Sequence, residues 1–107
     1  MLLSKPLTQA LNIIIKIADP DKVILFGSRA RGDASKDSDY DLLILKKGVK
    51  HNRKLSQKIY LKSDFDLPID IIVQDTTQFD QLKENPYMIY RSIFLEGKTI
   101  YEKSRYT

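Results

Sequence analysis

Three aspartates stand beside or inside apolar segments, where an isolated charge is costly to bury. Asp39 and Asp41 lie one residue apart at the start of YDLLIL (40–45), and Asp70 interrupts LPIDIIV (67–73). Side chains alternate faces along a strand, so Asp39 and Asp41 are expected on the same side. Their Cα atoms would be roughly 6–7 Å apart, from a rise of about 3.3 Å per residue. If the segment with Asp70 forms the neighbouring strand, the three carboxylates converge.

Converging carboxylates favour a bound divalent cation. At about 4 Å, two such charges repel by roughly 4 kcal/mol at an effective dielectric near 20. Oxygen ligands suit hard cations, so Asp39, Asp41 and Asp70 are predicted ligands of Mg²⁺ or Mn²⁺. Two such ions about 3.5–4 Å apart would stabilise the attacking and leaving oxygens of an in-line displacement.

A glycine-serine turn precedes the paired aspartates. KVILFGS (22–28) is predicted to be a strand ending at Gly27, and Ser28 is predicted to cap a short helix over 29–31. A helix N-terminus presents backbone N–H groups to phosphate, and glycine allows a close approach to the backbone. Gly27 and Ser28 are therefore candidate phosphate-binding residues. The segment matches neither the Walker A loop nor the Rossmann fingerprint.

The two arginines of the turn have two interpretations. Arg29 and Arg31 could contact phosphate, which makes them candidate nucleotide-binding residues. Alternatively, they could simply pair with Asp33 or Asp37 of the acidic loop that follows.

Other interpretations compete for the aspartates. A lone D-x-D is common in surface loops and caps, and Asp70 alone could be a strand-end residue or an ion-pair partner. The segment DASKDSDYD (33–41) also resembles the start of a calcium-binding EF-hand loop. That pattern fails because its sixth position is Ser38 rather than glycine, and its twelfth is Ile44 rather than glutamate.

The elements that would position these residues form an α+β chain. Hydrophobic periodicity, caps and turn residues predict helices and strands in the order α-β-β-α-β-α-α-β, besides the short helix over 29–31. The expected ranges are a helix over 6–18, strands at 22–28 and 40–45, a helix over 51–62, a strand at 67–73, helices over 76–84 and from 85–86 to Gly97, and a strand at 98–102. The short link between the first two strands favours an antiparallel pair, and the helix before the third permits a parallel crossover. We expect a small mixed sheet with helices packed on it.

Composition narrows the class of protein. The 107 residues fit one domain, 1–107, with 42% hydrophobic residues and a net charge of +4. No cysteine is present, so there is no disulfide framework, and no apolar run reaches the roughly 18 residues of a membrane span. A soluble cytoplasmic protein is expected. The basic balance is compatible with a nucleic-acid or nucleotide partner without requiring one.

The combination of GSRARG, SDYD and an aspartate within IDII resembles the signature of the DNA polymerase β-like nucleotidyltransferases, and in particular the minimal nucleotidyltransferase (MNT) group. The resemblance implies the polymerase β-like nucleotidyltransferase fold. It also implies transfer of a nucleoside monophosphate from a nucleoside triphosphate such as ATP to a hydroxyl. Asp39 and Asp41 match the metal-binding pair, Asp70 matches the third carboxylate, and Gly27 and Ser28 match the triphosphate-binding positions.

Small MNT proteins are commonly antitoxins of HEPN toxins, so the resemblance implies a HEPN partner in a hetero-oligomer. The acceptor would be a tyrosine hydroxyl of that toxin, modified with AMP from ATP in the presence of Mg²⁺. Two alternatives remain open at this point. One is an antitoxin that neutralises its partner by complex formation alone, and the other is a nucleotidyltransferase for a small molecule or an RNA end.

Overall fold

The computed structural model describes residues 3–104. Along that range its elements are α1 (Lys5–Ala18), β1 (Lys22–Phe26), α2 (Ser28–Arg31), β2 (Tyr40–Leu45), α3 (Asn52–Lys62), β3 (Ile69–Gln74), α4 (Thr76–Leu82), α5 (Ile89–Glu96) and β4 (Lys98–Glu102). This order is the one predicted from the sequence, with the short helix as α2. None of the helices in this range is long and apolar enough to cross a membrane.

Helix α1 begins and ends at the predicted signals. The Ser4 side chain accepts a hydrogen bond from the Leu7 N–H at 3.3 Å, and Pro6 lies in the first turn, where a missing N–H costs nothing. At the other end Asp19 adopts a left-handed conformation with φ of 46°, and its N–H bonds to the Ile15 carbonyl. The chain then enters β1.

Several predicted boundaries differ from the structure: β1 ends at Phe26 rather than at 28, β3 covers Ile69–Gln74 rather than 67–73, and α4 ends at Leu82 rather than at 84. Two further differences have identifiable reasons. Ser28 does not cap α2, because the cap position is Gly27 and Ser28 is already the first helical residue. Asn85-Pro86 does not begin α5. Instead the Asn85 side chain accepts a hydrogen bond from the Tyr87 N–H at 2.9 Å, which forms a local turn, and the helix begins at Ile89.

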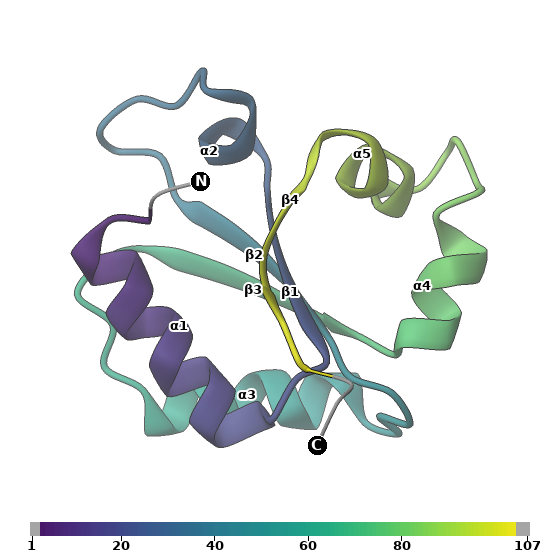
Figure 1. The fold of residues 1–107 in the computed structure, drawn as a ribbon, viewed down its shortest axis with the longest axis horizontal. Coiled ribbons are helices and arrows are strands. Elements are labelled where there is room, and N and C mark those ends of the chain that lie inside the picture. Colours follow the sequence, from purple (N-terminus) through teal and green to yellow (C-terminus); the bar gives the residue numbers. More distant parts are fainter. Residues whose placement is uncertain (1–2, 105–107) are drawn as a thin grey trace.

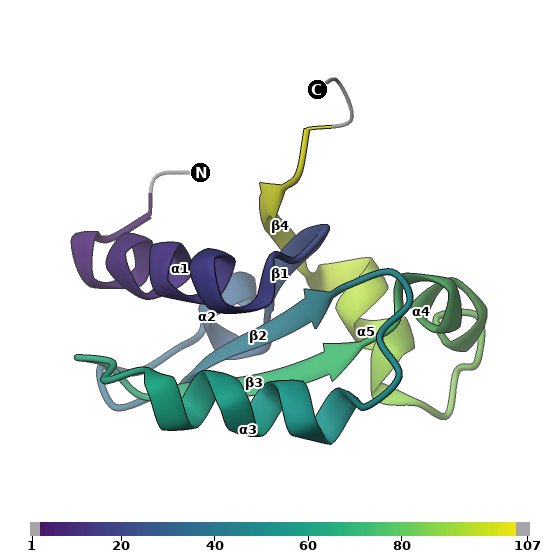
Figure 2. The ribbon, with the colours of Figure 1, turned by 90° about the horizontal axis from the view of Figure 1, so that it is seen from below.

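The four strands form one mixed sheet in the order β3-β2-β1-β4. Strand β1 pairs antiparallel with both β2 and β4, while β2 and β3 are parallel. The short link favoured the antiparallel pairing of β1 with β2, and the helix before β3 permitted the parallel one, whereas the pairing of β1 with β4 was not predicted. Helices α1 and α3 lie on one side of the sheet, and α4 and α5 lie on the other (Figures 1 and 2). Strands β3 and β4 are the two edges.

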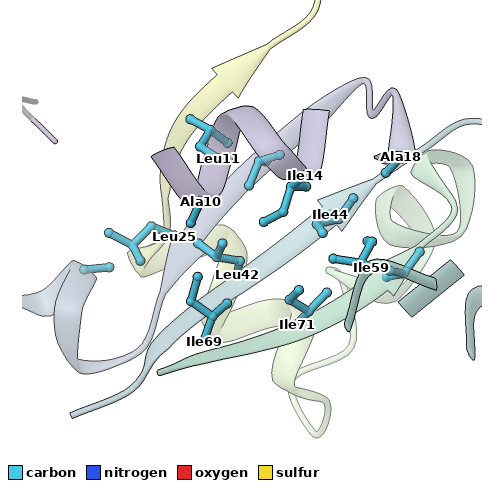
Figure 3. Close-up of a cluster of buried hydrophobic side chains, with 13 residues drawn as sticks. Ala10, Leu11, Ile14, Ala18, Leu25, Leu42, Ile44, Ile59, Ile69 and Ile71 are labelled. Carbon is cyan, nitrogen blue, oxygen red and sulfur yellow. The ribbon is translucent and has the colours of Figure 1, made fainter. Parts of the chain in front are cut away.

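Each side of the sheet has its own buried cluster. On the α1/α3 side, Ile14 and Ile59 pack against Leu42 and Ile44 of β2 (Figure 3). All four side chains are fully buried, and burial of each contributes about 1.5–3 kcal/mol. On the other side the cluster comprises Ile24, Phe26, Leu43, Leu45, Phe79 and Ile93. Because Leu42 and Ile44 anchor β2 on the first side, Asp41 must emerge on the second.

Candidate active site

The parallel pairing of β2 and β3 places two of the three predicted carboxylates side by side. Asp41 of β2 is directly opposite Asp70 of β3, and on its other flank it is opposite Phe26 of β1. Asp41 alternates with Leu42, and Asp70 with Ile71, whose side chains belong to the α1/α3 cluster. Both carboxylates therefore project to the α4/α5 side of the sheet. Each belongs to the second residue of its strand.

The surroundings of Asp41 shift the pKa of its carboxyl. It is half-buried, whereas Asp39 and Asp70 are exposed. Burial raises the pKa of Asp41, and the charges of Asp70 and Asp39 raise it further, while Arg31 partly opposes them. The ionised carboxylate is thus disfavoured in the protein alone, and a bound cation would favour it.

The turn after β1 is shaped around Asp41. Gly27 has φ of 72° and ψ of −156°, a backbone region that is essentially restricted to glycine. A Cβ atom built at Gly27 would overlap Oδ2 of Asp41. Glycine is therefore required here twice, by the backbone conformation and by the close approach of the carboxylate. The turn and Asp41 form one packed unit.

A small cavity opens beside this unit. It has a volume of about 210 Å³ and is lined by Phe26, Gly27, Arg31, Asp41, Ile89, Ser92, Ile93 and Glu96. The β1–α2 turn and β2 form one wall, and α5 forms the other. A larger cavity of about 830 Å³ lies between α4, α5 and the opposite ends of the strands, and neither Gly27 nor the three aspartates line it. Volume alone would thus select the wrong place for chemistry that uses the aspartates.

The two arginines of the turn have different surroundings. Arg29 donates hydrogen bonds to the carbonyls of Ser38 (3.0 Å) and Lys36 (3.3 Å), and its guanidinium lies over the Tyr40 ring at 4.4 Å. It therefore holds the loop that leads into β2. These contacts occupy the guanidinium of Arg29 within the loop.

Arg31 faces the small cavity. It contacts Asp33 at 3.3 Å, as one of the two interpretations anticipated, and Glu96 of α5 at 3.5 Å. The Asp33 contact is local in sequence. Glu96 is 65 residues from Arg31, so no local pattern could have revealed this link between α2 and α5. Sequence analysis also missed Ser92 and Ile89, which bring α5 to the cavity.

Carboxylate oxygens are the ligands that Mg²⁺ and Mn²⁺ take in proteins, so the residue types at the site fit such an ion. Asp41 and Asp70 are neighbours in register, and Asp39 is close enough to influence the pKa of Asp41. Within residues 3–104, however, no three His, Cys, Asp or Glu side chains are placed as one ready-made metal site. Nucleotide oxygens and water would have to complete the coordination of an ion held there.

Comparison with known proteins adds independent information. Residues 9–106 match the family described as "Polymerase beta, Nucleotidyltransferase". Two proteins of Methanocaldococcus jannaschii, each named "Putative protein adenylyltransferase", are similar in sequence. One is 43% identical over 53 residues, or 50% of this chain and 54% of the relative. The other is 35% identical over 81 residues, or 75% of this chain and 77% of the relative. The first match thus spans about half the length of that relative.

Two solved structures are similar in fold. A crystal structure titled as a putative nucleotidyltransferase from Sulfolobus solfataricus has a TM-score of 0.60 at 21% identity, covering 98% of this chain and 95% of that one. A toxin–antitoxin structure with AMP-PNP has a TM-score of 0.52 at 19% identity, covering 90% and 73%. The predicted polymerase β-like fold is confirmed. The family match over residues 9–106 and the second relative, 35% identical across three quarters of both chains, show that this chain belongs to the polymerase β-type nucleotidyltransferase family.

Proposed function

We propose that this protein transfers AMP from ATP, with Mg²⁺, to a hydroxyl of a partner protein, and that the partner is a toxin which it neutralises. The observation that carries the proposal is the in-register pairing of Asp41 with Asp70 beside the Gly27 turn. Membership of a nucleotidyltransferase family and two relatives named as protein adenylyltransferases support both the reaction and the class of acceptor.

Each residue of the site has a proposed role in the transfer. Asp39, Asp41 and Asp70 would hold Mg²⁺. Asp70 would also orient the acceptor hydroxyl and take its proton. Gly27 and Ser28 hold the triphosphate, with Arg31 nearby as a cation. A bound Mg²⁺ would supply positive charge next to the phosphate oxygens. The acceptor oxygen would bond to the α-phosphorus, and the bond from that phosphorus to the bridging oxygen would break, so that pyrophosphate leaves. The cavity of about 210 Å³ is below the roughly 300–1,000 Å³ of most small-molecule sites, so it accommodates only part of ATP. The rest of the nucleotide would lie at the surface or against the partner.

The identity of the partner rests on similarity rather than on the site. A protein of the same fold occurs in a toxin–antitoxin structure with AMP-PNP, an ATP analogue. The MNT-like motifs add the expectation that the toxin is a HEPN protein and that its acceptor is a tyrosine. A hetero-oligomer with that toxin follows from the same expectation.

The test uses ATP labelled at different phosphates. The protein is incubated with Mg²⁺ and a HEPN toxin as the candidate acceptor, using ATP labelled on either the α- or the γ-phosphate. Only the α-label should reach the toxin, and Asp41→Asn should abolish the transfer. Asp64→Asn is the matched control, because Asp64 is an exposed aspartate outside the site. Transfer of the γ-label, or full transfer by the Asp41 variant, would refute the proposal.

A second candidate function is an antitoxin that acts by binding alone. It is favoured by exposed apolar side chains on and before α5, where Tyr87 is 95% exposed, Leu95 is 63% exposed and Phe94 is 47% exposed. Such a surface suits contact with another protein. This alternative predicts that a folded variant carrying Asp39→Asn and Asp41→Asn still neutralises the toxin in cells. Loss of protection by that variant would exclude it.

A further inference from the structure

A tyrosine of α3 contacts the backbone on both sides of Asp70. The Tyr60 hydroxyl accepts a hydrogen bond from the Ile71 N–H at 2.7 Å and donates one to the Ile69 carbonyl at 3.5 Å. The first contact is short and the second is long for a hydroxyl donor, so Ile71 contributes most of the anchoring. Burial raises the pKa of the Tyr60 hydroxyl, which therefore stays protonated and keeps its donor at neutral pH.

The position of β3 in the sheet explains why this contact matters. Strand β3 is an edge, so main-chain groups on its outer side have no strand to pair with. Helix α3 runs alongside β3 (Figure 2), and Tyr60 reaches from it to that outer side. Ile69 and Ile71 contribute their side chains to the α1/α3 cluster, so Asp70 between them projects to the opposite side. The hydroxyl thus anchors the peptide units on either side of Asp70.

We propose that Tyr60 is a positioning residue for Asp70, holding the edge strand so that the Asp70 carboxylate stays aligned with Asp41. The inference rests on the proposed role of Asp70 in transfer. Tyr60 itself touches neither nucleotide nor acceptor in this account. Without the hydroxyl, β3 remains paired with β2, but its outer side is free to shift, and the Asp70 carboxylate shifts with it.

The test compares the deletion of two hydroxyls that contact the same strand, β3, from two different helices. Tyr60→Phe removes the anchor beside Asp70. Tyr90→Phe removes a hydroxyl that accepts a hydrogen bond from Gln74 at 3.1 Å, at the other end of β3. Tyr60→Phe should lower kcat for α-label transfer and the affinity for Mn²⁺ by about 2- to 10-fold, the net worth of one hydrogen bond, with KM for ATP unchanged. Tyr90→Phe also removes one hydrogen bond, but at the end of β3 away from Asp70. It should therefore leave kcat and the affinity for Mn²⁺ within about twofold of wild type.

A double-mutant cycle on Mn²⁺ affinity separates positioning from a general loss of stability. If Tyr60 acts through Asp70, Tyr60→Phe should cause no further loss when added to Asp70→Asn. A folded Tyr60→Phe protein with wild-type kcat and Mn²⁺ affinity would overturn the inference. So would a Tyr60→Phe effect that is fully additive with Asp70→Asn. These outcomes leave the proposed function standing, whereas full activity of Asp70→Asn by itself would remove the role of Asp70 and this inference with it.

Discussion

Replacement of Gly27 tests the claim that the turn is built around Asp41. Gly27→Ala forces alanine into an unfavourable backbone region at a cost of about 1–3 kcal/mol. The new methyl group also overlaps Oδ2 of Asp41 and lies 3.2 Å from its Cγ, so the carboxylate must move. Overpacking of this kind costs about 1–3 kcal/mol more. The expected loss of unfolding free energy is thus about 2–6 kcal/mol, from backbone and overlap together.

Gly48→Ala is the matched control for this substitution. Gly48 also has a positive φ, of 78°, but a Cβ there meets nothing within 4 Å. Its expected cost is therefore the backbone term alone, about 1–2 kcal/mol. Urea unfolding of the three proteins gives the comparison, and Mn²⁺ titration shows whether the Gly27 variant has lost the site as well. If Gly27→Ala is no more destabilising than Gly48→Ala and binds Mn²⁺ normally, the packed-turn argument is wrong.

Three further substitutions probe the surroundings of the site. Asp41→Asn should raise the Tm of the metal-free protein at pH 7, because the folded pKa of Asp41 is raised and ionisation therefore opposes folding. The difference in Tm should shrink as the pH falls through the raised pKa and the wild-type carboxyl becomes protonated. A wild-type protein with the higher Tm at pH 7 would contradict this reasoning. Leu42→Ala should cost about 2–5 kcal/mol in chemical denaturation, since the side chain is fully buried beneath α1 and α3, and a loss under about 1 kcal/mol would place it outside the core. Arg29→Ala should speed hydrogen exchange in the 33–38 loop, because the hydrogen bonds to two loop carbonyls are lost. Exchange in α1 is the internal reference, and equal loop exchange in both proteins would show that Arg29 does not hold the loop.

The sequence predicted where the candidate residues lie in the fold when the signals are local, and it failed where contacts come from distant segments. Alternation along β2 put Asp41 on the opposite side from Leu42, because the strand period of two applies wherever one face is buried. The pairing of Asp41 with Asp70 depended on the parallel crossover, which the helix between the strands made plausible but whose register no local pattern specifies. The Arg31–Glu96 contact and the bonds of Tyr60 to β3 join segments that share no sequence pattern.

Turn chemistry accounts for two of the differences in where helices begin. Ser28 is a favourable capping residue type, yet the close approach of Asp41 and the positive φ put glycine at the cap position and moved serine into the helix. Asn85-Pro86 has the composition of a helix start, but the Asn85 side chain satisfies the Tyr87 N–H in a turn instead. In both places a tertiary or side-chain contact outweighed a preference of only about 1 kcal/mol.

The central claim is that the paired strands β2 and β3 form a metal site. The most direct test measures the affinity for Mn²⁺ by electron paramagnetic resonance, in the presence of a non-hydrolysable ATP analogue. Wild type and Asp64→Asn should bind Mn²⁺ alike, whereas Asp41→Asn and Asp70→Asn should each weaken binding at least about tenfold, since each removes a charged oxygen ligand or its neighbour. Equal affinity in all four proteins would contradict a metal site built on the paired strands.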